Sequence, residues 1–236
     1  MKKVKLVVCD IDNTLVVKRQ PLTPRAKKVI DTLNEKGIYF GLASGRPVHH
    51  LQSLAEQWNI DCQLYIGMNG AEIYDTLTGR HEVLYTMKAQ WVKEAFEIMS
   101  LFKSWPHVLF DGIMYARPGD PSVVASNTYV KSKNTHHIVE SDEEFWHKDA
   151  IKIGFRVSDQ DMPAIEERVK AYQNDDYIGF KTETTMFEFG NTKAQKGALL
   201  KLFYETHQIE REAVWGFGDM TNDITLFDES GVAVCM

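Results

Sequence analysis

The segment from Lys5 to Val17, KLVVCDIDNTLVV, constrains the fold of this chain more than any other. A short apolar run, residues 6–9, leads directly into Asp10 and Asp12. Apolar runs of this kind are typical of buried strands in parallel sheets. Ligands of open α/β sheets bind outside the carboxyl ends of such strands. The segment therefore predicts a parallel α/β sheet with a polar site at the end of its first strand.

Asp10 and Asp12 lie two residues apart, so strand geometry would place both side chains on the same side. Two neighbouring carboxylates repel each other unless a cation or a shared proton offsets their charge. A hard divalent cation with oxygen ligands, Mg2+ above all, is the natural partner. Taken alone, the segment also fits a strand-end aspartate followed by an ordinary Asx turn at Asp12 and Asn13.

Polar residues follow the second predicted strand in a similar way. A helix that begins after Thr23 precedes an apolar strand over residues 38–43. Ser44, Gly45 and Arg46 come directly after this strand, where the next helix starts. A helix start with free backbone N–H groups favours an anion, although Ser44 could equally act only as a helix cap.

Two further polar segments lie near the end of the chain. Lys196 stands at the start of a predicted helix, where a positive charge opposes the helix dipole, so we expect it to face an anion or aspartates. The alternative is a solvated surface lysine. The predicted strand over residues 213–217 leads to Asp219, Asn222 and Asp223, so acidic residues again gather at the carboxyl end of a strand.

The middle of the chain, residues 81–187, loses the simple alternation of strand and helix. Asp111 and Gly112 form a hairpin signal between two short apolar runs. The pattern predicts helices over 87–102 and 162–172, and strands over 107–110, 113–116, 150–157, 177–182 and 186–189. It indicates an α+β domain with an antiparallel sheet, inserted into a core that consists of residues 1–80 and 188–236.

The insertion also contains polar and aromatic residues that carry no clear signal. Residues 119–134 are expected to form a helix or a loop. Four aromatic residues are interpreted as packing or ordinary surface residues and not as substrate-stacking groups: Trp105, Tyr115, Tyr129 and Trp146.

Composition limits the class of protein. The length of 236 residues allows one large domain or two modest ones, and the formal net charge of −6 offers no basic surface for nucleic acid. No stretch approaches the apolar length of a membrane span, and the N-terminus has no signal-peptide pattern. We expect a cytoplasmic protein that binds neither nucleic acid nor membrane. The scattered Cys9, Cys62 and Cys235 favour three reduced, buried thiols.

Together, the polar segments resemble the motifs of the haloacid dehalogenase (HAD) superfamily of phosphohydrolases. The motifs, in chain order, are Asp10-Ile11-Asp12-Asn13-Thr14-Leu15, Ser44-Gly45-Arg46, Lys196-Gly197 and Gly218-Asp219-Met220-Thr221-Asn222-Asp223. The large insertion, with the turn Asn69-Gly70-Ala71 before it, is similar to that of the Cof-type subfamily with a C2B cap. The resemblance implies a Rossmann-like parallel-sheet core, an inserted cap, and a Mg2+-dependent phosphatase that acts on small phosphate monoesters through an aspartyl-phosphate.

The resemblance also implies a role for each motif residue. Asp10 would be the nucleophile, and Asp12 would be the general acid and base. The metal ligands would be Asp10, the backbone carbonyl of Asp12, Asp219 and Asp223, although Asp223 could instead orient the motif lysine. The phosphate-binding set would comprise Ser44, Gly45, Lys196, Asn222 and Thr14, the last of which would donate a hydrogen bond within the first loop.

Several alternatives remain open at the level of sequence. The substrate would be a small phosphorylated metabolite such as a sugar phosphate, a nucleotide or a cofactor phosphate, bound by a monomer or weak homodimer. A sugar phosphomutase, a dedicated sugar-phosphate phosphatase and a non-catalytic sensor of phosphorylated ligands are the competing functions. Met220 replaces a residue that is commonly small in the family and is expected to narrow the pocket, and the core is expected to be truncated at its C-terminal end.

Overall fold

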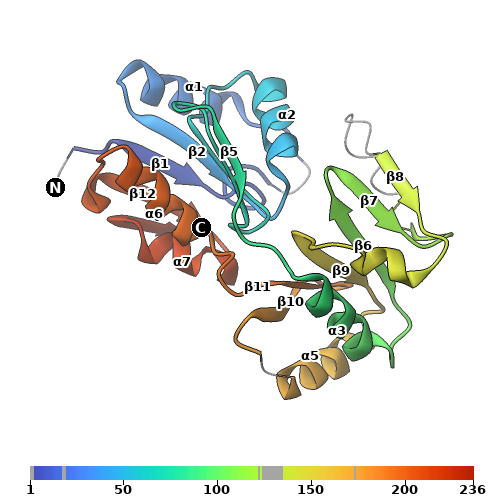
Figure 1. Cartoon of the computed structure of the whole chain (residues 1–236). Coiled ribbons are helices and arrows are strands. Elements are labelled where there is room, and N and C mark those ends of the chain that lie inside the picture. The colour runs from blue at the N-terminus through green and yellow to red at the C-terminus, as the bar shows by residue number, and fades with distance from the viewer. Residues whose placement is uncertain (1–2, 18–19, 122, 124–134, 173) are drawn as a thin grey trace. The chain divides into compact units, whose positions relative to one another are not determined.

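The computed structural model describes residues 3–17, 20–121, 123, 135–172 and 174–236 (Figure 1). The chain forms two compact units, one of Met1–Leu84 with Lys193–Met236 and one of Tyr85–Thr192. The second unit begins a few residues after the start of the expected insertion, 81–187, and ends a few residues after its end. The reason is that strand β5, Arg80–Val83, pairs within the sheet of the first unit, and β11, Met186–Asn191, lies within the sheet of the second.

The first unit contains a seven-stranded sheet of order β13-β12-β1-β2-β3-β4-β5. Its first five members in that order pair in parallel, and β4 and β5 are antiparallel. Besides β5, this sheet contains β1 Leu6–Cys9, β2 Tyr39–Ala43, β3 Leu64–Gly67, β4 Glu72–Asp75, β12 Val214–Gly218 and β13 Val232–Cys235. The α/β fold with a parallel-sheet core, expected from the sequence, is confirmed.

Helices pack on this sheet where the sequence places apolar residues at helical spacing. The helices are α1 Pro24–Glu35, α2 Val48–Trp58, α6 Lys196–Thr206 and α7 Ile224–Asp228, with short 3-10 turns at Arg211–Ala213 and Thr221–Asp223. Thr23 caps α1 as predicted, because its Oγ1 accepts a hydrogen bond from the backbone N–H of Ala26 at 3.2 Å. Val7 and Phe40 share a core with Ile30 and Leu51 of the helices.

The second unit contains a six-stranded sheet of order β10-β11-β9-β6-β7-β8. Its remaining elements are α3 Ala89–Met99, β6 Trp105–Phe110, β7 Ile113–Ala116, β8 Thr135–Ile138, a 3-10 helix at Asp142–Trp146, β9 Lys152–Arg156, α5 Met162–Ala171 and β10 Tyr177–Glu183. The predicted hairpin at Asp111 and Gly112 is present, and both residues have positive φ angles, 50° and 79°. α+β character is therefore confirmed.

The antiparallel sheet expected in this unit is present, with one exception at its edge. Strand β8 pairs in parallel with β7, from Ile113 opposite Thr135 to Ala116 opposite Ile138. A parallel pair needs a long crossover instead of a tight turn, so no hairpin signal marks it in the sequence. The segment Thr-His-His-Ile also lacks a strong strand pattern.

One face of the second sheet carries an apolar core. Phe155, Phe187 and Phe189 are almost fully buried there, and Tyr115 and Trp146 pack against it. These contacts agree with the interpretation of Tyr115 and Trp146 as packing groups. Tyr129 and most of residues 119–134 lie outside the described residues.

Two other expectations concern exposure. Cys9 and Cys62 are buried as predicted, but Cys235 is exposed, because β13 is the edge strand of its sheet and its side chains are only half covered. Among the described residues, no helix is both long and apolar enough to cross a membrane.

Candidate active site

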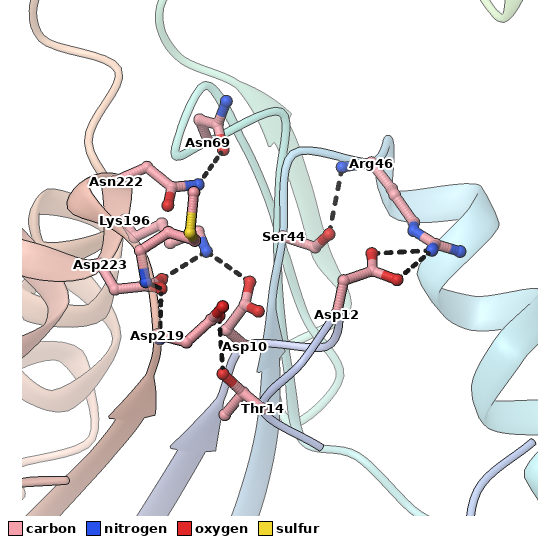
Figure 2. Close-up of polar contacts among 11 residues, drawn as sticks. Asp10, Asp12, Thr14, Ser44, Arg46, Asn69, Lys196, Asp219, Asn222 and Asp223 are labelled. Carbon is pink, nitrogen blue, oxygen red and sulfur yellow. Dashed lines mark hydrogen bonds and ion pairs between the residues drawn. The ribbon is translucent and has the colours of Figure 1, made fainter. Parts of the chain in front are cut away.

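The carboxyl ends of three neighbouring strands meet at one edge of the first sheet. In the sheet register Cys9 of β1 lies beside Leu42 of β2 and Phe217 of β12, so these strands end level with one another. Asp10, Ser44 and Asp219 follow directly. Figure 2 shows their side chains close together, with Lys196 and Asp223 from the α6 and α7 side.

Lys196 lies at the centre of this group. Its side chain is fully buried, and its Nζ lies 2.7 Å from Oδ1 of Asp10 and 2.6 Å from Oδ1 of Asp223 (Figure 2). The next residue, Gly197, lets α6 approach α7 closely, because a Cβ there would lie 2.0 Å from the backbone oxygen of Thr225. Lys196 is therefore held in place by packing and ion pairs, and the alternative of a solvated surface lysine is wrong.

Asp10, Asp219 and Asp223 form an acidic cluster around the lysine. Each offers one carboxylate oxygen, and these oxygens lie within 4.8 Å of one another. Three carboxylates face one ammonium group, so the cluster has an excess of negative charge. Oxygen-only donors with uncompensated charge suit a hard divalent cation. The residues present thus fit Mg2+.

The two oxygens of Asp223 already have protein partners. Oδ1 accepts from Lys196, and Oδ2 accepts from the backbone N–H groups of Asp219 and Met220, both at 3.1 Å. Of the two roles that the sequence left open for Asp223, these contacts favour orientation of the lysine. Met220 is 57 % exposed, so it does not fill the interior of the site.

Burial controls the electrostatics of Asp10. Desolvation raises the pKa of its carboxyl group from 3.8 to about 6, although the ion pair with Lys196 lowers it. Asp223 adds a second unfavourable negative charge. A bound cation would stabilise the carboxylate form, which is the nucleophilic one.

Thr14 does not bond within its own loop as expected. Its Oγ1 donates a hydrogen bond to Oδ1 of Asp219 at 3.0 Å (Figure 2). The contact joins the first loop to the loop that follows β12. Thr14 thus orients one carboxylate of the acidic cluster.

Asp12 turns away from Asp10, which corrects the expectation that both side chains lie on the same side. Both of its carboxylate oxygens accept from Nη2 of Arg46, at 2.9 and 2.8 Å (Figure 2). The expectation assumed that strand geometry persists to Asp12. Strand β1 instead ends at Cys9, and the chain turns so that the N–H of Leu15 donates to the backbone oxygen of Asp10.

Ser44 is buried at the end of β2, but it does not cap α2. Its Oγ accepts from the backbone N–H of Arg46 at 3.3 Å. The first N–H of the helix, at Val48, donates to Oε2 of Glu72 at 2.8 Å. The anion at the start of α2 is therefore a carboxylate of the protein. At the end of β2, this leaves Ser44 and Gly45, in the loop before the helix, as the candidate phosphate contacts.

A comparison with known proteins identifies the family. The model of the haloacid dehalogenase-like hydrolases matches residues 7–236. The chain belongs to this family. The expectation of a HAD-type phosphohydrolase is thereby confirmed.

Individual relatives are distant but cover nearly the whole chain. The 5-amino-6-(5-phospho-D-ribitylamino)uracil phosphatase YcsE of Bacillus subtilis is 24 % identical over 99 % of this chain and 84 % of its own length. The crystal structure of TM0651 from Thermotoga maritima aligns with a TM-score of 0.83 at 20 % identity, over 99 % of this chain and 86 % of that one. A haloacid dehalogenase-like hydrolase from Bacteroides thetaiotaomicron has a TM-score of 0.82 at 20 % identity, over 98 % and 88 %.

This HAD-family site contains residues to which the sequence alone gave no role. Arg46 was part of a motif, but nothing in its spacing indicates a pair with Asp12. Asn69 appeared only as a turn residue, yet its Oδ1 accepts from Nδ2 of Asn222 at 3.1 Å (Figure 2). Glu72 could have been recognised in the sequence, because an acidic residue in an otherwise apolar strand needs a buried partner.

Proposed function

We propose that this protein is a Mg2+-dependent phosphatase that hydrolyses small phosphate monoesters through an aspartyl-phosphate on Asp10. The observation that carries the proposal is the fully buried Lys196, held between Asp10 and Asp223 beside Asp219 at the carboxyl ends of the strands. A buried lysine there supplies a fixed positive charge for phosphoryl oxygens. The names of relatives, including the ribitylamino-uracil phosphatase, support a phosphorylated sugar-like metabolite as the substrate class.

Asp10, Asp219 and the backbone carbonyl of Asp12 are the groups that we assign to the metal. When bound, Mg2+ would neutralise the charge of the carboxylates and of the transferring phosphoryl group. Thr14 would keep the carboxylate of Asp219 oriented through its 3.0 Å hydrogen bond. Asp223 would orient the ammonium group of Lys196.

The chemistry then divides between Asp10 and Asp12. A carboxylate oxygen of Asp10 forms a bond to phosphorus while the bond from phosphorus to the leaving oxygen breaks. The carboxyl group of Asp12 gives its proton to that oxygen, which requires it to turn from Arg46. Asp12 then takes a proton from the water that attacks phosphorus and releases phosphate, which restores Asp10.

Ser44, the backbone of Gly45, Lys196 and Asn222 are the proposed contacts to the phosphoryl oxygens. These groups place positive charge and hydrogen-bond donors where the transition state carries negative charge. We assign the selection of the leaving group to the second unit, Tyr85–Thr192, as a cap. We also propose that the protein works in the cytoplasm as a monomer or weak homodimer.

The test is phosphate release from a panel of phosphate esters, with Mg2+ and with EDTA, for the protein and for Asp10→Asn. We expect release that needs both the metal and Asp10. Equal turnover by Asp10→Asn would refute the covalent mechanism. An isomerised phosphate ester in place of free phosphate would identify a mutase, and binding of esters without turnover would identify a sensor.

A further inference from the structure

The loop after β3 has an unusual backbone. Three consecutive residues, Met68, Asn69 and Gly70, have positive φ angles of 52°, 57° and 101°. Positive φ is uncommon for residues other than glycine, and such strain persists only where the surrounding structure holds it, often at functional sites. The sequence predicts only a tight turn here, which reverses the chain between β3 and β4. A reversal alone does not require three such residues.

On one side this loop holds the segment that contains Ser44. The backbone N–H of Asn69 donates to the carbonyl of Ser44 at 3.0 Å, and that of Met68 donates to the carbonyl of Arg46 at 2.9 Å. Gly45 lies against the Asn69 side chain, since a Cβ at position 45 would be 3.2 Å from its Oδ1. The loop therefore fixes the backbone that presents Ser44.

On the other side the same loop contacts the segments that carry the other two candidate phosphate contacts. Oδ1 of Asn69 accepts a hydrogen bond from Nδ2 of Asn222 at 3.1 Å (Figure 2). A Cβ at Gly70 would lie 2.2 Å from the backbone of Gln195, the residue before Lys196. Three segments that are far apart in the sequence thus meet at one loop of three residues.

We propose that Asn69 is a positioning residue for phosphate binding. Its backbone N–H holds Ser44, and its side-chain oxygen holds the amide of Asn222, so that both groups keep the spacing that a phosphate group requires. The inference rests on the proposed function, because that function makes Ser44 and Asn222 phosphate contacts. Asparagine suits the position, since it tolerates the left-handed conformation and carries an acceptor oxygen.

The test is the affinity for inorganic phosphate, measured by calorimetry in the presence of Mg2+. Asn69→Gly keeps the backbone N–H and permits the positive φ, but removes the acceptor for Asn222. We expect affinity to fall by about tenfold, as for loss of one hydrogen bond. The matched control is Asn59→Gly at the far end of α2, where φ is 50°; it is expected to leave phosphate affinity unchanged.

A double-mutant cycle separates positioning from general loosening of the fold. If Asn69 acts through Asn222, the double variant Asn69→Gly/Asn222→Ala binds phosphate no more than about threefold more weakly than Asn222→Ala alone. The inference would be overturned if the loss of phosphate affinity in the double variant equals the product of the losses in the two single variants. Unchanged phosphate affinity in Asn69→Gly would also overturn it.

The assay also separates this inference from the proposed function. Wild-type protein that binds phosphate in an Asn69-dependent way but hydrolyses no ester would overturn the function and leave the inference standing. Ester hydrolysis by the wild-type protein, together with normal phosphate binding by Asn69→Gly, would overturn the inference and leave the proposed function standing. A wild-type protein that binds no phosphate would overturn the inference, and it would overturn the proposed function as well if it also releases no phosphate from esters.

Discussion

Asp10 should make the metal-free protein less stable at neutral pH, so Asp10→Asn should stabilise it. Asparagine resembles the protonated aspartic acid in shape and carries no charge. The variant therefore removes the cost of a buried carboxylate while keeping its volume. The side chain of Asp10 is 11 % exposed, so solvent screens this cost only weakly.

The magnitude follows from the pKa of Asp10, which burial raises from 3.8 to about 6 against the opposing effect of Lys196. Between these values the folded state binds more protons than the unfolded state, so the free energy of unfolding falls as pH rises from about 4 to about 6. At about 1.4 kcal/mol per pKa unit, the loss is roughly 3 kcal/mol above the folded pKa. The free energy of unfolding of Asp10→Asn should therefore exceed that of wild type by roughly 3 kcal/mol at pH 7.5, and the two should be nearly equal at pH 4.

Urea unfolding in EDTA at pH 4.5, 6 and 7.5 measures this difference directly. The control is Asp31→Asn, which changes a half-exposed carboxylate on α1 that pairs with Lys27, and which should show no comparable gain between pH 4.5 and 7.5. Added Mg2+ should stabilise wild type and reduce the gap, because it binds the carboxylate form. A gap that is constant with pH, or a less stable Asp10→Asn at pH 7.5, would refute the reasoning.

Two further predictions concern the groups around the site. Thr14→Val should raise the Mg2+ concentration needed for half-maximal phosphatase activity by about tenfold, because Asp219 loses the donor that orients it; an unchanged Mg2+ requirement would contradict this role. Gly197→Ala should lower the Tm by many degrees, because its Cβ would lie 2.0 Å from the backbone oxygen of Thr225. The matched control Gly190→Ala meets its nearest atom at 3.7 Å and should change the Tm little; equal shifts would contradict the packing argument.

Local chemistry explains the parts of the fold that were predicted correctly. Thr23 caps its helix through a hydrogen bond to a residue three positions on, and Asp111 with Gly112 forms a tight turn. Each feature depends on a few adjacent residues, so a single sequence contains its cause. The buried strand over residues 6–9 was also predictable, because a short apolar run is stable mainly in the interior of a sheet.

Features that depend on residues far away in the sequence could not be predicted. Strand β8 pairs in parallel with β7 across a long connection, so its position comes from the sheet and not from its own residues. Asp12 lies opposite Arg46 because the chain leaves strand geometry after Cys9, which no spacing rule indicates. Burial of Cys235 was wrongly predicted, because edge position is a property of the whole sheet.

The sequence by itself determined which residue types the site contains and in which order they follow predicted strands. That information suffices for the parallel-sheet core and the phosphohydrolase family, since motifs at strand ends are local patterns. Only the tertiary structure decided which of these side chains contact one another. It places Lys196 between Asp10 and Asp223 and turns Asp12 toward Arg46, because side-chain partners depend on how strands and helices pack and not on their spacing along the chain.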